Sequence, residues 1–157
     1  MVETLIIPTR PNAMITRTLS DISKTISDIE FAMLSTRASN GFLSSRPMSN
    51  NGDVEYNGDN YFFAFDQSHT VKDIERDPKV GLSFVGSKSL LGKPPTFVTI
   101  EAQAELIRDK AQFEKHWHSS VDKYANEGVN TPGLVLINTH AVRIHYWHGH
   151  DEQELVV

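Results

Sequence analysis

The first regular pattern in the chain is a repeat of apolar residues at the spacing of an α-helix. From Thr18 onward apolar side chains recur every three or four positions, with serine and aspartate between them. These apolar residues are Leu19, Ile22, Ile26 and Ile29. The period predicts an amphipathic helix. The preceding residues 1–16 contain two prolines and no period, and we expect them to form an extended N-terminal arm.

Two strand-like runs follow this helix. They cover residues 31–37 (FAMLSTR) and 42–48 (FLSSRPM), and the pair Asn40-Gly41 stands between them. Asn-Gly is a strong turn signal between strands, because both residues tolerate a positive φ. The pattern therefore predicts a β-hairpin.

Helices and strands alternate irregularly over the rest of the chain. A short helix is expected over residues 68–78, which begin with a hydroxyl residue, place Val71 and Ile74 on one face and stop at proline. A longer helix is expected from Asp109, with one apolar stripe formed by Phe113, Trp117, Val121 and Tyr124. Further strands are expected at residues 61–65, 79–86, 96–106, 134–139 and 142–149.

These elements predict a mainly β fold with peripheral helices. Helical connections between strands are few, which favours an antiparallel sheet. Such a sheet hides its edges most easily by closing into a barrel. We expect one domain over residues 17–150, followed by a C-terminal tail over residues 151–157 with a frayed end after Gly149.

Composition narrows the class of protein. The 157 residues are 39% hydrophobic and 22% charged, which is ordinary for a single soluble domain and untypical of disordered chains. No apolar run approaches the roughly 20 residues of a membrane span. The acidic start MVETLII does not resemble a signal peptide, so we expect a cytoplasmic protein without a membrane partner.

Charge and residue usage exclude several kinds of chemistry. The absence of cysteine excludes disulfides, thiolate catalysis and cysteine-bound metal. A formal net charge of −5 without a lysine or arginine cluster argues against a nucleic-acid partner. The seven histidines lack a metal-binding spacing, so we expect no metal site. Motifs for nucleophilic hydrolysis and for Rossmann or Walker nucleotide binding are also missing.

Two short segments carry candidate binding chemistry. Arg46, followed directly by Pro47, offers a planar fork of donors suited to a phosphate or to the edge of a flat heterocycle. Ser68 precedes a predicted helix, whose free N–H groups favour an anion. Each has a plainer alternative, because Arg46 can be an exposed strand residue and Ser68 an ordinary helix N-cap.

Four stretches in order complete the picture: FAMLSTRASNGFLSSRPM, YFFAFDQSHTVKDIERDPKVGLSFVG, TIEAQAEL and LVLINTHAVRIHYWHG. Between residues 19 and 149 the chain resembles the general stress protein branch of the pyridoxamine 5′-phosphate oxidase-like, FMN-binding split-barrel superfamily. The resemblance implies a six-stranded antiparallel split β-barrel with peripheral helices. It also implies a homodimer that holds one FMN at each of two sites between the subunits.

The resemblance also implies which residues bind the cofactor. They are Arg46, Pro47, Met48, Phe63, Ala64, Ser68, His69, Thr70, Lys72, Phe97 and Trp147. The family pattern usually has threonine at the position of Ala64 and lysine at the position of Thr70, so two polar contacts to the phosphate are missing here. Catalytic residues stay unknown, since no side chain can be named as an acid or a base.

The resemblance implies an FMN-binding protein of the general stress type. The leading hypothesis is a flavin-dependent oxidoreductase that acts on an unknown small redox partner by hydride or electron transfer. The alternatives are a non-catalytic flavin-buffering or sensing module, and a split-barrel dimer that has lost the cofactor. Pyridoxamine phosphate oxidase activity is not expected, because HGHDEQELVV after Trp147 lacks the arginine and histidine that grip that substrate.

Overall fold

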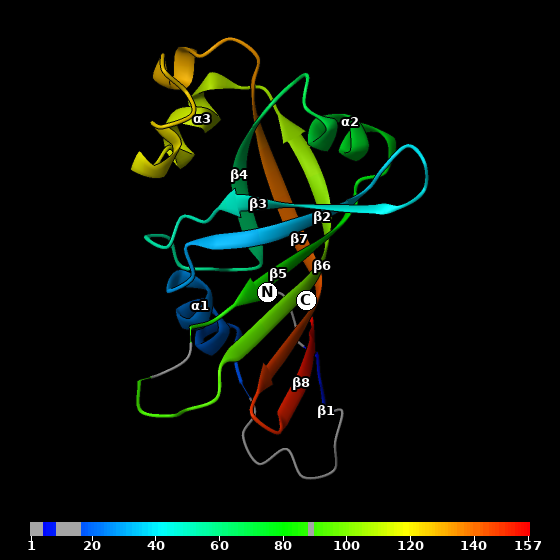
Figure 1. Cartoon of the computed structure of the whole chain (residues 1–157), viewed down its shortest axis with the longest axis vertical. Coiled ribbons are helices and arrows are strands. Elements are labelled where there is room, and N and C mark those ends of the chain that lie inside the picture. Colours follow the sequence, from blue (N-terminus) through cyan, green and yellow to red (C-terminus); the bar gives the residue numbers. More distant parts are fainter. Residues whose placement is uncertain (1–4, 9–16, 88–89) are drawn as a thin grey trace.

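The structure is a computed structural model that describes residues 5–8, 17–87 and 90–157 (Figure 1). In these ranges the chain forms one antiparallel sheet of eight strands with three α-helices around it. The helices are α1 (Leu19–Ser27), α2 (His69–Arg76) and α3 (Lys110–His116). The strands are β1 (Leu5–Pro8), β2 (Phe31–Arg37), β3 (Leu43–Ser49), β4 (Asp59–Phe65), β5 (Lys79–Val85), β6 (Thr96–Ile107), β7 (Leu134–His148) and β8 (Asp151–Val156).

The predicted mainly β, antiparallel fold is confirmed. The β2–β3 hairpin forms as expected, and Gly41 in its turn has a positive φ of 85°. Helix α1 begins with a capping box, in which the Thr18 hydroxyl accepts from the Asp21 N–H and the Asp21 carboxylate accepts from the Thr18 N–H. The sheet has more strands than the six expected, because β1 and β8 extend it.

The sheet curls into a barrel that is open along one line. Its order is β1-β8-β7-β6-β5-β2-β3, and β4 pairs with β7 outside this path. Strand β4 takes the first half of one β7 edge, from Leu134 to His140, and β8 takes the second half of the same edge, from Arg143 to His148. In the described part of the chain β3 pairs only with β2, and β4 only with β7. The barrel is therefore split between β3 and β4.

Strand β7 corrects one prediction. Residues 134–139 and 142–149 were expected as two strands, but they belong to one strand of 15 residues. Its register against β6 shifts in the middle, because Glu101 pairs with Arg143 while Ala102 pairs with Ala141. Val142 is thus an extra residue, which makes a β-bulge. The bulge bends β7 without ending it.

The expected long helix from Asp109 is wrong. Helix α3 ends at His116, and Trp117 is extended, with φ −65° and ψ 139°. Two short 3₁₀ turns follow, η1 (Ser119–Val121) and η2 (Gly128–Asn130). The Trp117 indole N–H donates to Asp122 Oδ1 at 2.9 Å and holds the chain in this tighter path.

The frayed C-terminal end is also wrong. Gly149 has a φ of 61° and turns the chain back, so that β8 pairs with β7 on one edge and with β1 on the other. Gln153 and Leu155 of β8 are buried. Of the arm expected over residues 1–16, only residues 5–8 are described, as β1; the other residues of the arm lie outside the described ranges.

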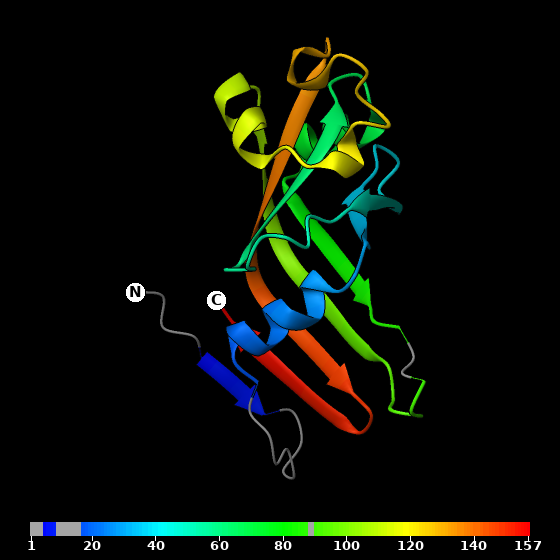
Figure 2. The same cartoon turned by 90° about the vertical axis from the view of Figure 1, so that its left-hand side faces the viewer.

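Buried hydrophobic residues in the described ranges form two clusters. The larger fills the barrel, where α1 inserts Ile22 and Ile26. Figure 2 shows α1 alongside the strands below the segment of residues 110–133. The smaller cluster lies under α3 and joins Phe113, Val121 and Leu136. In it the rings of Tyr61 and His116 are stacked, with centroids 3.6 Å apart.

One side chain ties α1 to the loop that follows β3. The Asn50 amide Nδ2 donates to the carbonyls of Ile26 and Ile29, each at 2.9 Å. We expect Asn50→Ala to lower the free energy of unfolding by about 1–3 kcal/mol, because the carbonyls of Ile26 and Ile29, near the end of α1, each lose the hydrogen bond from Asn50. Urea unfolding measures this. Asn51→Ala is the control, since Asn51 Oδ1 accepts only from the exposed N–H of Asp53. Equal losses in the two variants would contradict the role of Asn50.

A second prediction concerns pH. Burial lowers the pKa of His116 from its ordinary value of 6.5, and the charge of Lys115 lowers it further. His116 therefore takes up a proton at higher pH in the unfolded chain than in the folded chain. As pH falls through 6.5, protonation favours the unfolded chain, and the free energy of unfolding decreases. His116→Phe keeps an aromatic ring on Tyr61 but removes the titration. We expect this variant to lose less stability than wild type between about pH 7.5 and about pH 5.5.

The control for this titration is His150→Phe, which changes an exposed histidine. Its urea unfolding shows the effect of a histidine-to-phenylalanine change at the surface. A slope for His116→Phe equal to that of wild type would show that His116 is not responsible.

Candidate functional site

The split of the barrel contains a cavity of about 350 Å³. It lies between the ends of β3 and β4, each of which has an edge without a strand partner among the described residues. The segment after α3 forms its third wall. Its lining residues are Phe31, Pro47, Met48, Ser49, Phe63, Ala64, Phe65, Val121, Tyr124, Ala125 and Leu134. Such a mainly apolar hollow beside free backbone groups suits a flat ring with polar edges.

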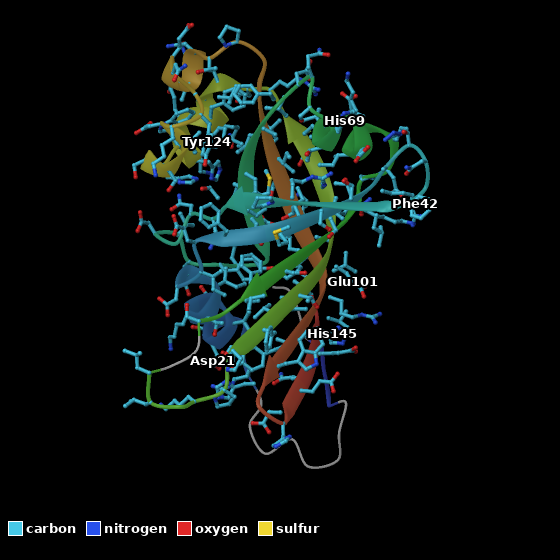
Figure 3. The ribbon with its side chains drawn as sticks, in the orientation of Figure 1. Asp21, Phe42, His69, Glu101, Tyr124 and His145 are labelled. Atoms are coloured by element: carbon cyan, nitrogen blue, oxygen red, sulfur yellow. The ribbon has the colours of Figure 1, made fainter. Side chains whose placement is uncertain are left out.

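Four of the eleven predicted site residues line this cavity. They are Pro47 and Met48 from β3, and Phe63 and Ala64 from β4. Pro47 is tolerated here because β3 is an edge strand of the sheet. Sequence reasoning missed the wall formed by Val121, Tyr124 and Ala125, because Tyr124 was assigned to the apolar stripe of a long helix. In the structure the Tyr124 side chain is 63% exposed at the rim (Figure 3).

Arg46 is not the solvent-exposed strand residue of the plainer sequence interpretation. Its side chain is only 19% exposed. Nη1 donates to the Leu34 carbonyl at 3.2 Å and to the Thr36 hydroxyl at 2.7 Å, and Nη2 lies 3.6 Å from Asp73 Oδ2. Arg46 is therefore tied to β2 and α2. Its Nε–H has no acceptor among the described residues and is available to a ligand.

Asp73 is the centre of this polar group. Its carboxylate accepts hydrogen bonds from the Thr36 hydroxyl at 2.7 Å and from Arg76 Nη2 at 2.5 Å. Burial would raise the pKa of Asp73, but the bonds from Thr36 and Arg76, together with the charges of Arg76 and Arg46, outweigh burial and lower it. Burial lowers the pKa of Arg46, and Asp73 partly opposes this. Both groups are charged at neutral pH.

Ser68, the N-cap of α2, lies three residues beyond the cavity residue Phe65. The Ser68 hydroxyl accepts from the Val71 N–H at 3.3 Å, so the N-cap interpretation of Ser68 is confirmed. His69 and Lys72 are exposed, whereas Thr70 is buried. The N–H groups of His69 and Thr70 have no acceptor in the described ranges, as is usual in the first turn of a helix.

Arg108, the residue directly after β6, fixes the connection between β4 and α2. Arg108 Nη2 lies 2.7 Å from Asp66 Oδ1 and 3.0 Å from Glu75 Oε1. The hydrogen bond to Asp66 is the largest influence that raises the pKa of Arg108. Sequence reasoning missed this group, since its members are far apart in the chain. It holds the start of α2 in place beside the cavity.

Phe97 and Trp147 lie at the other end of the molecule. They are directly paired across β6 and β7, and Trp147 packs near His145, with ring centroids 5.0 Å apart. Figure 3 shows His145 well below His69, at the end of the sheet where β8 runs. One chain therefore does not bring Phe97 and Trp147 to the cavity.

Other kinds of site find no support in the described ranges. No three His, Cys, Asp or Glu side chains there are placed to hold a metal ion. In the same ranges, none of the helices combines the length and the apolar character that a membrane span needs.

Solved structures share this architecture. A protein from Clostridium acetobutylicum related to general stress protein 26 of Bacillus subtilis superposes with a TM-score of 0.74 at 16% identity, covering 88% of this chain and 94% of that chain. General stress protein 26 of Bacillus anthracis gives a TM-score of 0.64 at 23% identity, covering 80% and 89%. A heme binding protein from Mycobacterium smegmatis gives a TM-score of 0.71 at 12% identity, covering 92% and 60%.

The sequence has no significant match among curated proteins. A family model described as pyridoxamine 5′-phosphate oxidase like matches residues 17–157. The resemblance inferred from the four sequence stretches is thereby confirmed. Since the match spans nearly the whole chain, the protein belongs to the pyridoxamine 5′-phosphate oxidase like family.

Proposed function

We propose that this protein binds FMN in the cavity between β3 and β4. The observation that carries the proposal is the cavity itself, a largely apolar hollow of about 350 Å³ between two unpaired strand edges. An isoalloxazine ring has two flat apolar faces and a polar edge. Pro47, Met48, Phe63 and Ala64 would pack on the ring, and free backbone groups of β3 and β4 would bond its edge.

The phosphate of FMN would lie toward the start of α2. The unpaired N–H groups of His69 and Thr70 and the side chains of Ser68 and Lys72 would contact it there, with the Nε–H of Arg46 as a further donor. These groups fit an anion, but none of them lines the cavity itself. The ring contacts are therefore the stronger part of the fit.

When bound, FMN supplies hydride or electron transfer. The chain would hold the ring, set its orientation and exclude water from it. Tyr124 is the one titratable side chain among the lining residues, and it is exposed at the rim. We therefore assign no catalytic acid or base to the chain. The same observation favours a second candidate, a flavin-binding module without turnover.

We further propose that the site is completed by a second copy of the chain. Phe97 and Trp147 lie away from the cavity on one face of the sheet, where Phe97 is 40% exposed. In a twofold dimer each protomer can present this face to the cavity of the other. Trp147 would then cover the flavin ring of the partner and keep water away from it.

The first prediction here concerns binding at the rim of the cavity. We expect the protein to bind FMN with quenching of flavin fluorescence, and Tyr124→Ala to raise the Kd by about two- to twelvefold, because an aromatic contact contributes about 0.5–1.5 kcal/mol. Phe42→Ala is the matched control, since Phe42 is an exposed aromatic at the far tip of the β2–β3 hairpin (Figure 3). It should bind FMN like wild type. No uptake of FMN at tens of micromolar would leave only a cofactor-free barrel.

The reactivity of the complex separates the two candidates. Bleaching of the flavin absorbance by NADH or NADPH would support an oxidoreductase. A yellow protein that does not react with either would support the binding module.

A second prediction tests the shared site. Ala64→Trp should block the cavity, and Trp147→Ala should remove the cover that the partner supplies, so each variant alone should bind FMN weakly. Mixed dimers of the two variants keep one intact site and should regain wild-type affinity at that site. Sedimentation should show dimers throughout. Mixed dimers of Trp147→Ala and Phe97→Ala are the control, because no site in them is intact; binding there, or a monomeric wild type, would contradict the shared site.

A further inference from the structure

Arg46, which would be a further donor to a ligand phosphate, already has a buried anionic partner. Asp73 lies 3.6 Å from Arg46 Nη2, and its side chain is only 5% exposed. Asp73 also belongs to α2, the helix whose start would receive the phosphate. A ligand phosphate near Arg46 therefore meets a fixed negative charge in the same low-dielectric surroundings.

The contacts show that this partner is built into the fold. The Thr36 hydroxyl accepts from Arg46 Nη1 and donates to Asp73 Oδ2, and Thr36 is 1% exposed. Arg46 also donates to the backbone carbonyl of Leu34. The pair thus links β2, β3 and α2 through a side chain that is shielded from water. Dissolved salt screens buried charges only weakly, so the interaction between Arg46 and Asp73 keeps most of its strength.

The other charged side chains near Arg46 and Asp73 do not compensate for the negative charge of Asp73. Arg76 is the other cation on Asp73, but it is 45% exposed and bonds the opposite carboxylate oxygen, Oδ1. Arg37 is paired with Asp77 at the far end of α2. Thr70 and Ala64, which lie near the start of α2, are uncharged. Lys72, also on α2, is exposed.

We propose that Asp73 acts as an internal counter-ion that sets the ligand class of this site, so that the site recognises flavins by their ring and gains little from a terminal phosphate. This inference rests on the proposed flavin site. The ligand class is a flat isoalloxazine with or without phosphate, so riboflavin binds nearly as well as FMN. Asp73 is a specificity-determining residue that acts through Arg46 and does not touch the ring.

The test compares riboflavin and FMN on the full-length protein by titration of flavin fluorescence. In wild type the Kd for riboflavin should exceed that for FMN by less than tenfold. In Asp73→Asn this ratio should rise at least tenfold, because FMN binds more tightly while riboflavin is unchanged. Asp77→Asn, which removes a carboxylate at the exposed end of α2, should keep the wild-type ratio. A wild-type ratio above tenfold, or a ratio that Asp73→Asn leaves unchanged, would overturn the proposal.

Inorganic phosphate alone separates this inference from flavin binding. At constant ionic strength, phosphate should raise the melting temperature of Asp73→Asn more than that of wild type, and adding Arg46→Gln should remove the gain. If neither flavin binds, the proposed function fails, but the phosphate comparison still decides the role of Asp73. Asp73→Ser, which leaves room for an anion beside Arg46, serves if Asp73→Asn does not fold. Equal phosphate effects in wild type and in the folded variant would refute the counter-ion.

Discussion

Backbone pairing along β7 is the constraint on which the architecture depends. This strand is long enough to carry β6 on one edge, and β4 and β8 in succession on the other. The bulge at Val142 lets β7 bend between the two halves while it stays in the sheet. Because β7 is the only strand partner of β4 among the described residues, the second edge of β4 stays open toward β3. The cavity at the split follows directly from that arrangement.

A buried ion pair, Arg46 and Asp73, lies in the same region of the molecule. A buried charge is costly unless it is paired, and each of these side chains makes the burial of the other tolerable. The pair connects the β2–β3 hairpin to α2 from inside the barrel, and the contacts of Arg108 with Asp66 and Glu75 hold α2 from outside. The start of α2 is thus fixed next to the cavity from two sides. A helix start that is held in place beside an apolar cavity can position a ligand, even where the helix start attracts phosphate only modestly.

Two groups of aromatic side chains lie differently with respect to the cavity. Phe63, Phe113 and Trp117 pack on one another beneath α3 and support the cavity wall from within one chain. Phe97 and Trp147 lie side by side on the outer face at the opposite end of the sheet. Their partial exposure is difficult to explain by packing within one protomer. The proposed second copy of the chain would cover these side chains, and the proposed shared ligand site depends on that contact.

Local patterns in the sequence were sufficient for the hairpin, α1, α2 and the antiparallel class, because caps, turn residues and apolar periods act over a few neighbours. Four residues that line the cavity, Pro47, Met48, Phe63 and Ala64, were also predicted as site residues from the family resemblance. The pairing of Arg46 with Asp73, the wall that includes Tyr124, and the strand β8 were not predicted. Each depends on contacts between segments distant in the chain: burial decides the partner of a charge, the turn after Trp117 decides where Tyr124 lies, and an open edge of β7 draws the acidic C-terminal segment into the sheet.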